Sequence, residues 1–391
     1  MLDLDGLVAV RDIDAQRSWV FRNDAVELAV THRGAHMAPV TFYSNEEEPI
    51  RPYYISPLRA AASSEGDHPE VFRGDFFCLP YGSNHAPYNG ERHPSHGETA
   101  RSLWSLVGEN RDQSETRITL EIRPKVRPGK VIRKLSLIDG QNAVYDSTII
   151  EGFAGKSTMA HHAVLAVPKA ERTLLISSSP FVFGMTCPYP FSDPAKGEYQ
   201  ALEVNARFKD LSSVPARTQT AAGKDCSAFP TRPGYSDLLQ TWSDPIGYEP
   251  AWVTAVNTEE RFLWFALKDP KVLPGRVLWM ENRGRHGVPW NDRINCLGIE
   301  DGCMFFDAGI AASCAPNAVT QAGFPTCHEF RNDAPLAVNY VQGVMRVPED
   351  FGYVRRAKFE SDGVRFVSEE GHGVFARVNH RFIFSGSFGA T

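Results

Sequence analysis

Short β-forming runs separated by turn signals recur along the whole chain of 391 residues. Turn signals such as Pro128-Gly129 and Asp139-Gly140 stand between them. Strands spaced at about 8–12 residues are typical of a large sandwich or barrel. The runs lie at 19–21, 25–30, 117–122, 131–138, 143–150, 162–167, 173–176, 252–256, 262–267, 277–279, 336–347, 364–367 and 374–378. The sequence therefore predicts an all-β fold of mostly antiparallel strands.

Helices should be few and short, because no long stretch keeps a 3.6-residue apolar period. One helix is expected within residues 195–211. Two long irregular stretches, 45–98 and 193–248, are predicted to be loops, and long loops in a compact β domain are usually functional. Since no linker composition divides the chain, we expect a single domain over residues 1–391.

Composition excludes several classes of protein. The net charge of −6, from 41 basic and 47 acidic residues, argues against a dedicated nucleic-acid binder. Apolar runs such as 262–267 are too short to span a bilayer, so no membrane insertion is expected. The first residues show no basic region followed by an apolar stretch, so no secretion signal is expected. Seven scattered cysteines without a C-x-x-C pair indicate thiols in a reducing cytoplasm.

The residues that could carry chemistry fall into three groups. The first loop contains Arg73-Gly74 leading to Pro80-Tyr81-Gly82, then His96-Gly97 followed by Arg101 and Trp104. A pair, His161-His162, precedes an apolar strand near mid-chain. Glu300 follows the apolar run Cys296-Leu297-Gly298-Ile299.

In this order and spacing, residues from about 18 to 310 resemble the galactose mutarotase-like superfamily, which includes aldose 1-epimerases and hexose-6-phosphate 1-epimerase-like proteins. The usual Asn-Arg pair is absent around Arg73, so the chain resembles a divergent branch. The resemblance implies a β-supersandwich with an open cleft and a cytoplasmic enzyme that interconverts sugar anomers without a metal or organic cofactor. The expected partner is a small sugar or sugar phosphate, while the oligomeric state is not readable.

The resemblance also implies roles for particular residues. Glu300 would be the catalytic base and His162 the catalytic acid. The expected substrate-binding residues are Arg73, His96, Asp237, Trp104, Trp290 and Phe77. If the sugar is phosphorylated, the available basic clamp is Arg283, Arg285 and Arg293.

These residue types suit the reaction. Opening a pyranose requires a base for the C1 hydroxyl and an acid for the ring oxygen, and a carboxylate and an imidazole on opposite sides of the ring can exchange these roles on closure. Arg73 and His96 would stabilise developing charge on oxygen. Aromatic rings such as Trp290 would stack on the apolar face of the sugar.

Structural interpretations compete with these roles. Arg73 can pair with Asp75, His96 can cap the turn at Gly97, and Trp104 can belong to the core. His161 and His162 alternate across a strand, so only one can face a cleft, and the neighbouring apolar residues favour His162.

Three other functions stay open at this point. His85, His93 and His96, with Glu98, could bind a metal ion in a β-barrel enzyme. The chain could also be a non-catalytic carbohydrate-binding β domain. A glycoside hydrolase would pair Glu300 with Asp292 or Asp237.

Overall fold

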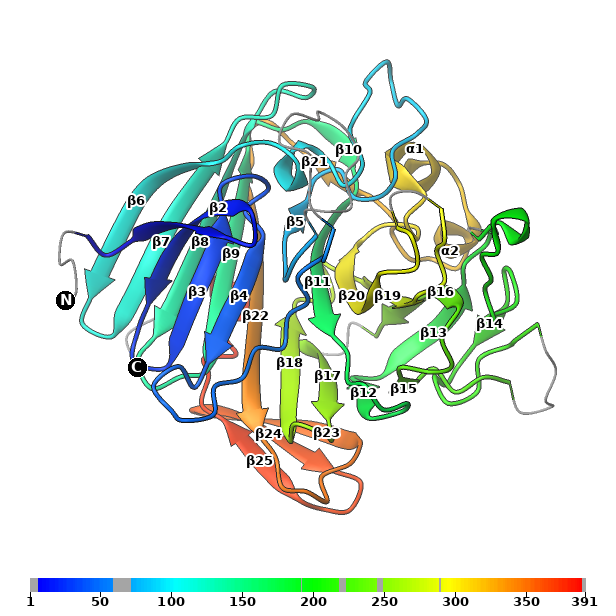
Figure 1. Ribbon diagram of the computed structural model, residues 1–391. Coiled ribbons are helices and arrows are strands. Elements are labelled where there is room, and N and C mark those ends of the chain that lie inside the picture. The colour runs from blue at the N-terminus through cyan, green and yellow to red at the C-terminus, as the bar shows by residue number, and fades with distance from the viewer. Residues whose placement is uncertain are drawn as a thin grey trace.

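Strands dominate the computed structural model, and neighbouring strands pair antiparallel as expected (Figure 1). The structure describes residues 6–58, 72–190, 192–217, 223–244, 249–287 and 290–388. The two largest sheets have seven and nine strands. The prediction of an all-β sandwich is therefore confirmed.

The seven-stranded sheet has the order β14 (Arg207–Phe208), β13 (Phe181–Thr186), β16 (Tyr235–Ser243), β19 (Gly275–Asn282), β20 (Asn295–Cys303), β11 (Met159–Ala166) and β5 (Phe77–Cys78). The nine-stranded sheet has the order β15 (Ala228–Phe229), β12 (Leu174–Ser178), β17 (Ala251–Asn257), β18 (Phe262–Lys268), β22 (Leu336–Arg346), β9 (Ala143–Glu151), β8 (Lys130–Ile138), β7 (Glu115–Ile122) and β6 (Ser105–Asp112).

Three smaller sheets complete the strands. They are β1 (Ala9–Ile13), β2 (Gln16–Arg22), β3 (Val26–Thr31) and β4 (Met37–Phe42); β10 (Gly155–Ser157) and β21 (His328–Phe330); and β23 (Val354–Glu360), β24 (Gly363–Ser368) and β25 (Gly373–Ala376).

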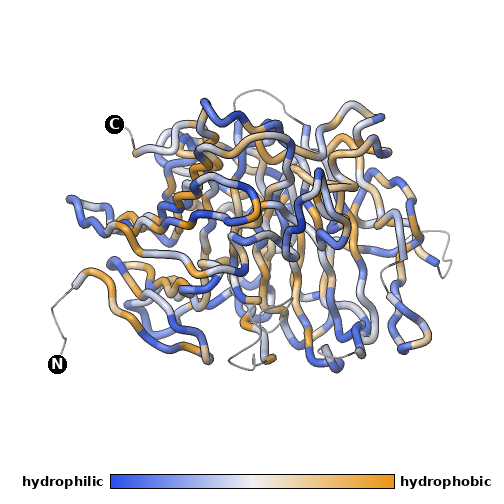
Figure 2. The backbone as a smooth tube through the Cα atoms, turned by 90° about the horizontal axis from the view of Figure 1, so that it is seen from above, coloured by the Kyte–Doolittle hydropathy of each residue, from blue (hydrophilic) through white to orange (hydrophobic). Residues whose placement is uncertain are grey.

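The seven-stranded and nine-stranded sheets share the largest hydrophobic core. Leu297 and Ile299 of β20 and Trp264 of β18 belong to it, and the four-stranded sheet contributes residues such as Phe21 and Leu28. Figure 2 shows hydrophobic stretches along the strands and polar stretches in many of the connecting turns. Burial of this alternating apolar face is the main force that holds the sheets together.

Two further cores cover the outer faces of the large sheets. Trp279 of β19 and Cys296 of β20 pack with Val319 on one side of the seven-stranded sheet. Phe265 of β18 packs with Phe366 of β24 on the outer side of the nine-stranded sheet. The face of the seven-stranded sheet that carries Trp279 and Cys296 also carries the pocket described below, and we call it the pocket face.

Helices in the described residues are short, as predicted. They are α1 (Gly309–Cys314), α2 (Ala318–Gln321), α3 (Phe382–Ser385) and the 3-10 helices η2 (Glu98–Ala100) and η3 (Pro194–Lys196). The helix expected within 195–211 is wrong: only the end of η3 falls there, because Gly197 at φ 76° ends that turn and β14 follows.

Strand β16 was missed, since it lies in the stretch 193–248 that was predicted to be a loop. Its polar residues are buried with hydrogen-bond partners: Ser236 donates to Glu281, and Gln240 donates to the carbonyl of Met304. A strand whose polar side chains are satisfied by distant residues has no period-two signal.

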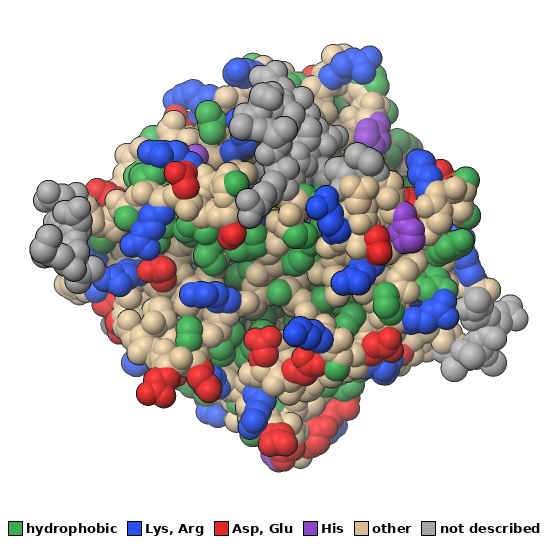
Figure 3. All heavy atoms as spheres, viewed as in Figure 1, with side chains coloured by type: hydrophobic (Ala, Val, Ile, Leu, Met, Phe, Trp, Pro, Cys, Tyr) green, Lys and Arg blue, Asp and Glu red, His purple; other side chains and the backbone are tan. Residues whose placement is uncertain are grey.

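The surface shows no broad region of one charge on the face in view: basic and acidic side chains are mixed there (Figure 3). No helix among the described residues is long and apolar enough to cross a membrane.

Candidate active site

The pairing of β11 with β20 brings the two predicted acid–base residues together. His162 lies opposite Glu300, and His161 lies opposite Asp301. Directly paired residues share a face of a sheet and successive residues alternate between faces. His162 and Glu300 therefore both lie on the pocket face, where His162 Nε2 is 3.5 Å from Glu300 Oε2.

A pocket of about 300 Å³ opens above this pair. Its residues come from the first loop, from β11, β16, β19 and β20, and from the loops around β20. It is lined by Phe72, Tyr81, Ser83, His85, Ser95, His96, Arg101, His162, Leu238, Trp279, Arg285, Trp290, Glu300 and Asp307. Aromatic walls with a few convergent polar groups are typical of small-molecule sites.

Aromatic rings fix the His162 imidazole. Phe76 stacks on it at 4.6 Å between ring centroids, and Phe72 stacks on it at 5.9 Å. His96 meets it edge to face at 5.1 Å and reaches Cys78 Sγ at 3.7 Å through Nδ1. The next residue, Gly97, lets the loop that carries His96 pass close to Leu79, since a Cβ at Gly97 would lie 2.0 Å from the carbonyl oxygen of Leu79.

Polar residues from several loops surround Glu300. The hydroxyl of Tyr81 donates a hydrogen bond to Glu300 Oε2. Asp307 accepts hydrogen bonds from Ser83 at 3.2 Å and from the hydroxyl of Tyr189. Arg285 lies over the Trp290 ring at 4.6 Å and brings positive charge to the same pocket.

Burial controls the charge of the acid–base pair. It raises the pKa of Glu300 to about 8, although the Tyr81 hydrogen bond acts in the opposite direction. Burial lowers the pKa of His162 to about 3. It also holds the pKa of His96 well below its usual value, and the neighbouring His162 acts in the same direction. At neutral pH, Glu300 and His162 together therefore hold one proton, which is on the carboxyl group.

The opposite face of the same strands is occupied by a fully buried ion network. His161 Nδ1 lies 3.0 Å from Asp75 Oδ2, and Arg133 contacts the same oxygen at 2.9 Å. Asp301 pairs with Lys268 at 2.6 Å and with Arg276 at 2.9 Å. His161 thus belongs to the interior, which leaves His162 as the histidine of the pocket.

The relative position of the pair differs from the expectation. The predicted arrangement has the two groups on opposite sides of a pyranose, but 3.5 Å between them leaves no room for a ring. They lie side by side because cross-strand partners are immediate neighbours. A sugar would have to lie over the pair instead.

The structure places Arg73 and Phe77 outside the pocket. Arg73 is buried and donates to the carbonyls of Ile13 and Asp14, at 3.0 and 3.1 Å. Phe77 pairs with His161 across β5 and β11, so its ring faces the interior. Both expectations are corrected by strand geometry and by distant backbone partners.

Trp104 and Asp237 are outside the pocket as well. Trp104 belongs to the main core and donates to the carbonyl of Thr99 at 2.8 Å. Asp237 accepts from the backbone amide of Ala201 at 2.8 Å and pairs with Lys224 at 2.6 Å. Its neighbour Leu238 lines the pocket, so Asp237 lies on the other face of β16.

His96, His162, Trp290 and Glu300 are the predicted site residues that do line one pocket. Tyr81, Phe72, Trp279 and Asp307 also line the pocket, although they were not predicted as site residues. The turn Pro80-Tyr81-Gly82 was the available signal for Tyr81. Asp307 follows β20 closely, but nothing local in the sequence marks it as a pocket residue.

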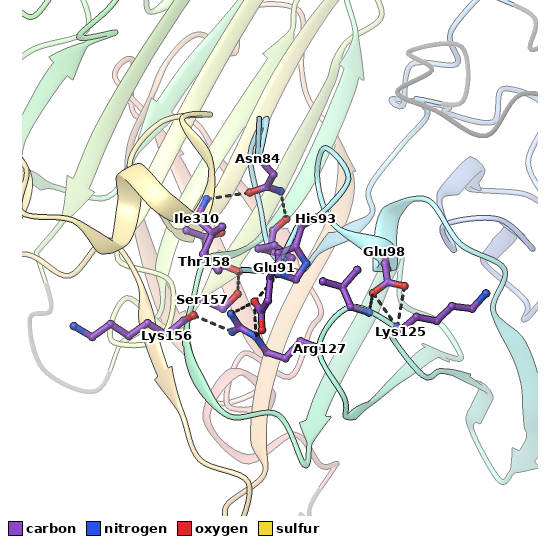
Figure 4. Close-up of polar contacts among 12 residues, drawn as sticks. Asn84, Glu91, His93, Glu98, Lys125, Arg127, Lys156, Ser157, Thr158 and Ile310 are labelled. Carbon is purple, nitrogen blue, oxygen red and sulfur yellow. Dashed lines mark hydrogen bonds and ion pairs between the residues drawn. The ribbon is translucent and has the colours of Figure 1, made fainter. Parts of the chain in front are cut away.

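Two residues of the metal hypothesis, His93 and Glu98, have partners of their own (Figure 4). His93 lies 2.9 Å from the Glu91 carboxylate, which also binds Arg127. The Glu98 carboxylate accepts the backbone amides of Lys125 and Val126. His93, Glu98 and His96 thus have other partners, and among the described residues His85, His93 and His96 are not grouped at metal-like spacing.

Within the described residues, one group of potential ligands has metal-like spacing. It consists of Asp75, Asp146 and His161 in the interior network. Arg133 contacts both carboxylates, at 2.9 and 2.6 Å, and supplies the positive charge there. This group therefore fits an ion network rather than a metal site.

No protein-family model matches this chain, and no curated protein matches it. Solved structures do. The chain is similar to the YeaD protein from Salmonella typhimurium, at 11% identity over 88% of this chain and 96% of that one, with a TM-score of 0.58.

It is also similar to a galactose mutarotase related enzyme from Lactobacillus acidophilus, at 12% identity over 85% and 98% of the two chains, with a TM-score of 0.54. A galactose mutarotase-like protein from Clostridium acetobutylicum matches at 9% identity over 87% and 98%, also with a TM-score of 0.54. At these identities the comparison shows the fold, and the chain has the galactose mutarotase-like fold.

Proposed function

We propose that this protein is a mutarotase that interconverts sugar anomers at C1 by general acid–base catalysis with ring opening. The observation that carries the proposal is the buried pair of Glu300 and His162, 3.5 Å apart on the floor of an aromatic-walled pocket. The galactose mutarotase-like fold supports it by analogy.

Side-by-side placement suits the reaction because O1 and O5 of a pyranose are both bonded to C1. A sugar lying over the pair presents one oxygen to each group. In ring opening, Glu300 donates its proton to O5 while His162 removes the proton from the O1 hydroxyl, and C1 becomes an aldehyde. After rotation about C1–C2, each group reverses its transfer, O5 attacks the other face of C1, and the starting protonation returns.

These starting roles reverse the expected ones, in which Glu300 is the base and His162 the acid. The two distributions differ only in which partner holds the single proton. The raised pKa of Glu300 and the lowered pKa of His162 favour starting with the proton on Glu300. His96, edge-on to His162 in the same pocket, would bind a substrate hydroxyl.

We infer that the ligand is a single sugar or sugar phosphate. Trp290 and Trp279 at the pocket wall, with ring centroids 6.1 Å apart, offer stacking surfaces for the C–H face of a pyranose. Arg101 and Arg285 line the pocket and would neutralise a phosphate group. Of the expected clamp, Arg283 and Arg293 are not among the lining residues.

We further infer a reducing compartment, with the cytoplasm as the proposed location. The seven cysteines all lie in the described residues, and all are free thiols. Five of them are buried. This pattern supports a compartment in which disulfides are rare.

Polarimetry or magnetisation-transfer NMR on aldoses and their 6-phosphates tests the proposal. Glu300→Gln and His162→Ala should each reduce catalysed mutarotation by about 10²-fold or more, as loss of a general acid or base does. Asp292→Asn is the matched control, because Asp292 is an exposed carboxylate outside the pocket lining.

Rates of Glu300→Gln within a few-fold of the parent would reject the assignment. Sugar binding without any acceleration by the parent protein would favour the carbohydrate-binding alternative. Release of a reducing sugar from a glycoside, lost in Glu300→Gln, would favour a hydrolase.

A further inference from the structure

Tyr81 occupies a fixed position next to Glu300. Its backbone N–H donates to the carbonyl of Thr158 at 3.4 Å, and its carbonyl accepts from the Thr158 hydroxyl at 2.8 Å. Thr158 directly precedes β11, so the loop that carries Tyr81 is attached to the strand that carries His162. The next residue, Gly82, packs directly against the backbone of Gly309. A side chain would not fit there, since a Cβ at Gly82 would lie 2.6 Å from the Gly309 nitrogen.

The phenol of Tyr81 contacts one particular oxygen of Glu300. Its hydroxyl donates to Oε2, and Oε2 is also the oxygen that lies 3.5 Å from His162 Nε2. Tyr81 is 1% exposed and Glu300 2% exposed, so water does not compete for this contact. Because the carbonyl oxygen of a carboxyl group is its better acceptor, the hydrogen bond to Oε2 favours the proton on Oε1.

Gly298, two residues before Glu300 on β20, leaves space for Glu300 Oε1. A Cβ at Gly298 would lie 2.8 Å from Glu300 Oε1 and 3.0 Å from Trp279 Cβ. Gly298 stands two residues before Glu300 on β20 and so shares its face. Any larger residue at position 298 would displace Oε1 from its place beside Trp279, which lines the pocket.

We propose that Tyr81 is a positioning residue that holds Glu300 by Oε2, so that Oε1 is the oxygen that exchanges a proton with the sugar. This inference rests on the proposed mutarotase function. In ring opening, the Oε1–H bond breaks and its proton goes to O5 of the sugar; in ring closure, Oε1 takes that proton back. Tyr81 keeps its own proton throughout.

The acid strengths of the two groups are consistent with this role. Burial and the nearby Glu300 hold the pKa of Tyr81 well above its usual value, so the phenol is a donor at every working pH. A donor to a carboxylate stabilises the ionised form, and the Tyr81 hydrogen bond opposes the effect of burial on Glu300. Without it, Glu300 would release its proton less readily.

Tyr81→Phe tests the proposal by two measurements. The first is the pKa of Glu300, followed as the carboxyl band in difference infrared spectra against Glu300→Gln. Loss of a hydrogen bond to the ionised form should raise it by about one unit. The second is steady-state mutarotation, where kcat should fall about tenfold with KM within a few-fold of the parent.

Tyr340→Phe is the matched control. The Tyr340 hydroxyl donates to Asp301 Oδ2 at 2.8 Å and is equally buried, but it lies on the interior face. Tyr340→Phe should reduce stability and leave both the pKa of Glu300 and kcat unchanged.

Gly298→Ala keeps the test informative if Tyr81→Phe does not fold. It should lower kcat about tenfold or more while Tyr81 is intact, because a general acid acts only at hydrogen-bond reach. An unchanged Glu300 pKa in Tyr81→Phe, or full activity in Gly298→Ala, would overturn the positioning role.

The infrared titration needs no substrate, so it separates the two hypotheses. The parent protein could fail to accelerate the mutarotation of any aldose while Tyr81→Phe still raises the pKa of Glu300. That result would reject the mutarotase function but support the positioning of Glu300 Oε2 by Tyr81.

Discussion

The two faces of the β11–β20 pair carry the same kinds of groups at the same depth, but the pKa values of their carboxyl groups are shifted in opposite directions. Each face presents one histidine and one carboxyl group as cross-strand neighbours, His162 with Glu300 and His161 with Asp301. All four side chains are nearly or fully buried. The pKa of Glu300 is raised to about 8, whereas that of Asp301 is lowered to about 2.

Partners explain the difference. Asp301 contacts Arg276 and Lys268, and their positive charges outweigh the effect of burial. Glu300 receives a hydrogen bond from Tyr81 and feels Arg285 only as a weaker influence, so burial prevails. Burial alone therefore does not set ionisation, and the pocket face is the one that keeps an exchangeable proton.

The largest effect should come from breaking the interior face. Asp301→Asn removes the carboxylate that balances Lys268 and Arg276, and leaving buried charges unpaired should lower the free energy of unfolding by about 3–5 kcal/mol. Urea denaturation measures this. Asp333→Asn breaks an exposed pair with Arg331 and should change stability little. Equal losses in the two variants would contradict the contrast between the faces.

The strands and the choice of His162 were predictable from the sequence, but the contrast in ionisation was not. The β-forming run at 162–167 and the apolar run before Glu300 indicated two strands. Because successive strand residues face opposite sides, only one of His161 and His162 could face a cleft. The partners were not predictable. Arg133, Lys268 and Arg276 come from three other strands, and Tyr81 comes from a loop, so nothing in the local sequence shows that they converge.

The same limit explains the residues that the structure moved out of the site. Arg73 donates to carbonyls at the end of β1 and in the turn after it, and Asp237 accepts from the amides of residues 201 and 202. The sequence alone does not distinguish a charged residue that binds buried backbone groups from one that binds a ligand. Only the tertiary structure shows that its hydrogen bonds are already made.

The protonated Glu300 on the pocket face should make the free energy of unfolding of the protein depend on pH. Folded Glu300 keeps its proton up to about pH 8, while the unfolded chain loses it near the ordinary value of 4.5. The parent therefore loses stability as pH rises through this interval, and between pH 6 and 9 Glu300 should contribute a loss of about 2–3 kcal/mol.

Glu300→Gln has no such proton, so its stability should fall less than that of the parent over the same interval. Chemical denaturation of both proteins at pH 6 and pH 9 measures the difference. A parallel decline in the two would show that Glu300 is not a protonated carboxyl group in the folded protein.

A smaller effect is expected in the pH dependence of kcat/KM. If Glu300 and His162 work with one shared proton, kcat/KM should be nearly constant around neutrality and fall about tenfold per pH unit above pH 8 as that proton is lost. If the carboxylate acts alone as a base, kcat/KM should instead rise through pH 8. Mutarotation rates from pH 6 to pH 9.5 distinguish the two.

The consecutive placement of His161 and His162 also bears on how the chain finds its native strand register. A slip of β11 by one residue against β20 would turn His161 towards the pocket and leave Asp75 without its imidazole partner. Hydrophobic side chains alone tolerate such slips better than paired charges do. The interior ion network therefore favours the native register over a one-residue slip, and that register sets a proton donor beside a proton acceptor.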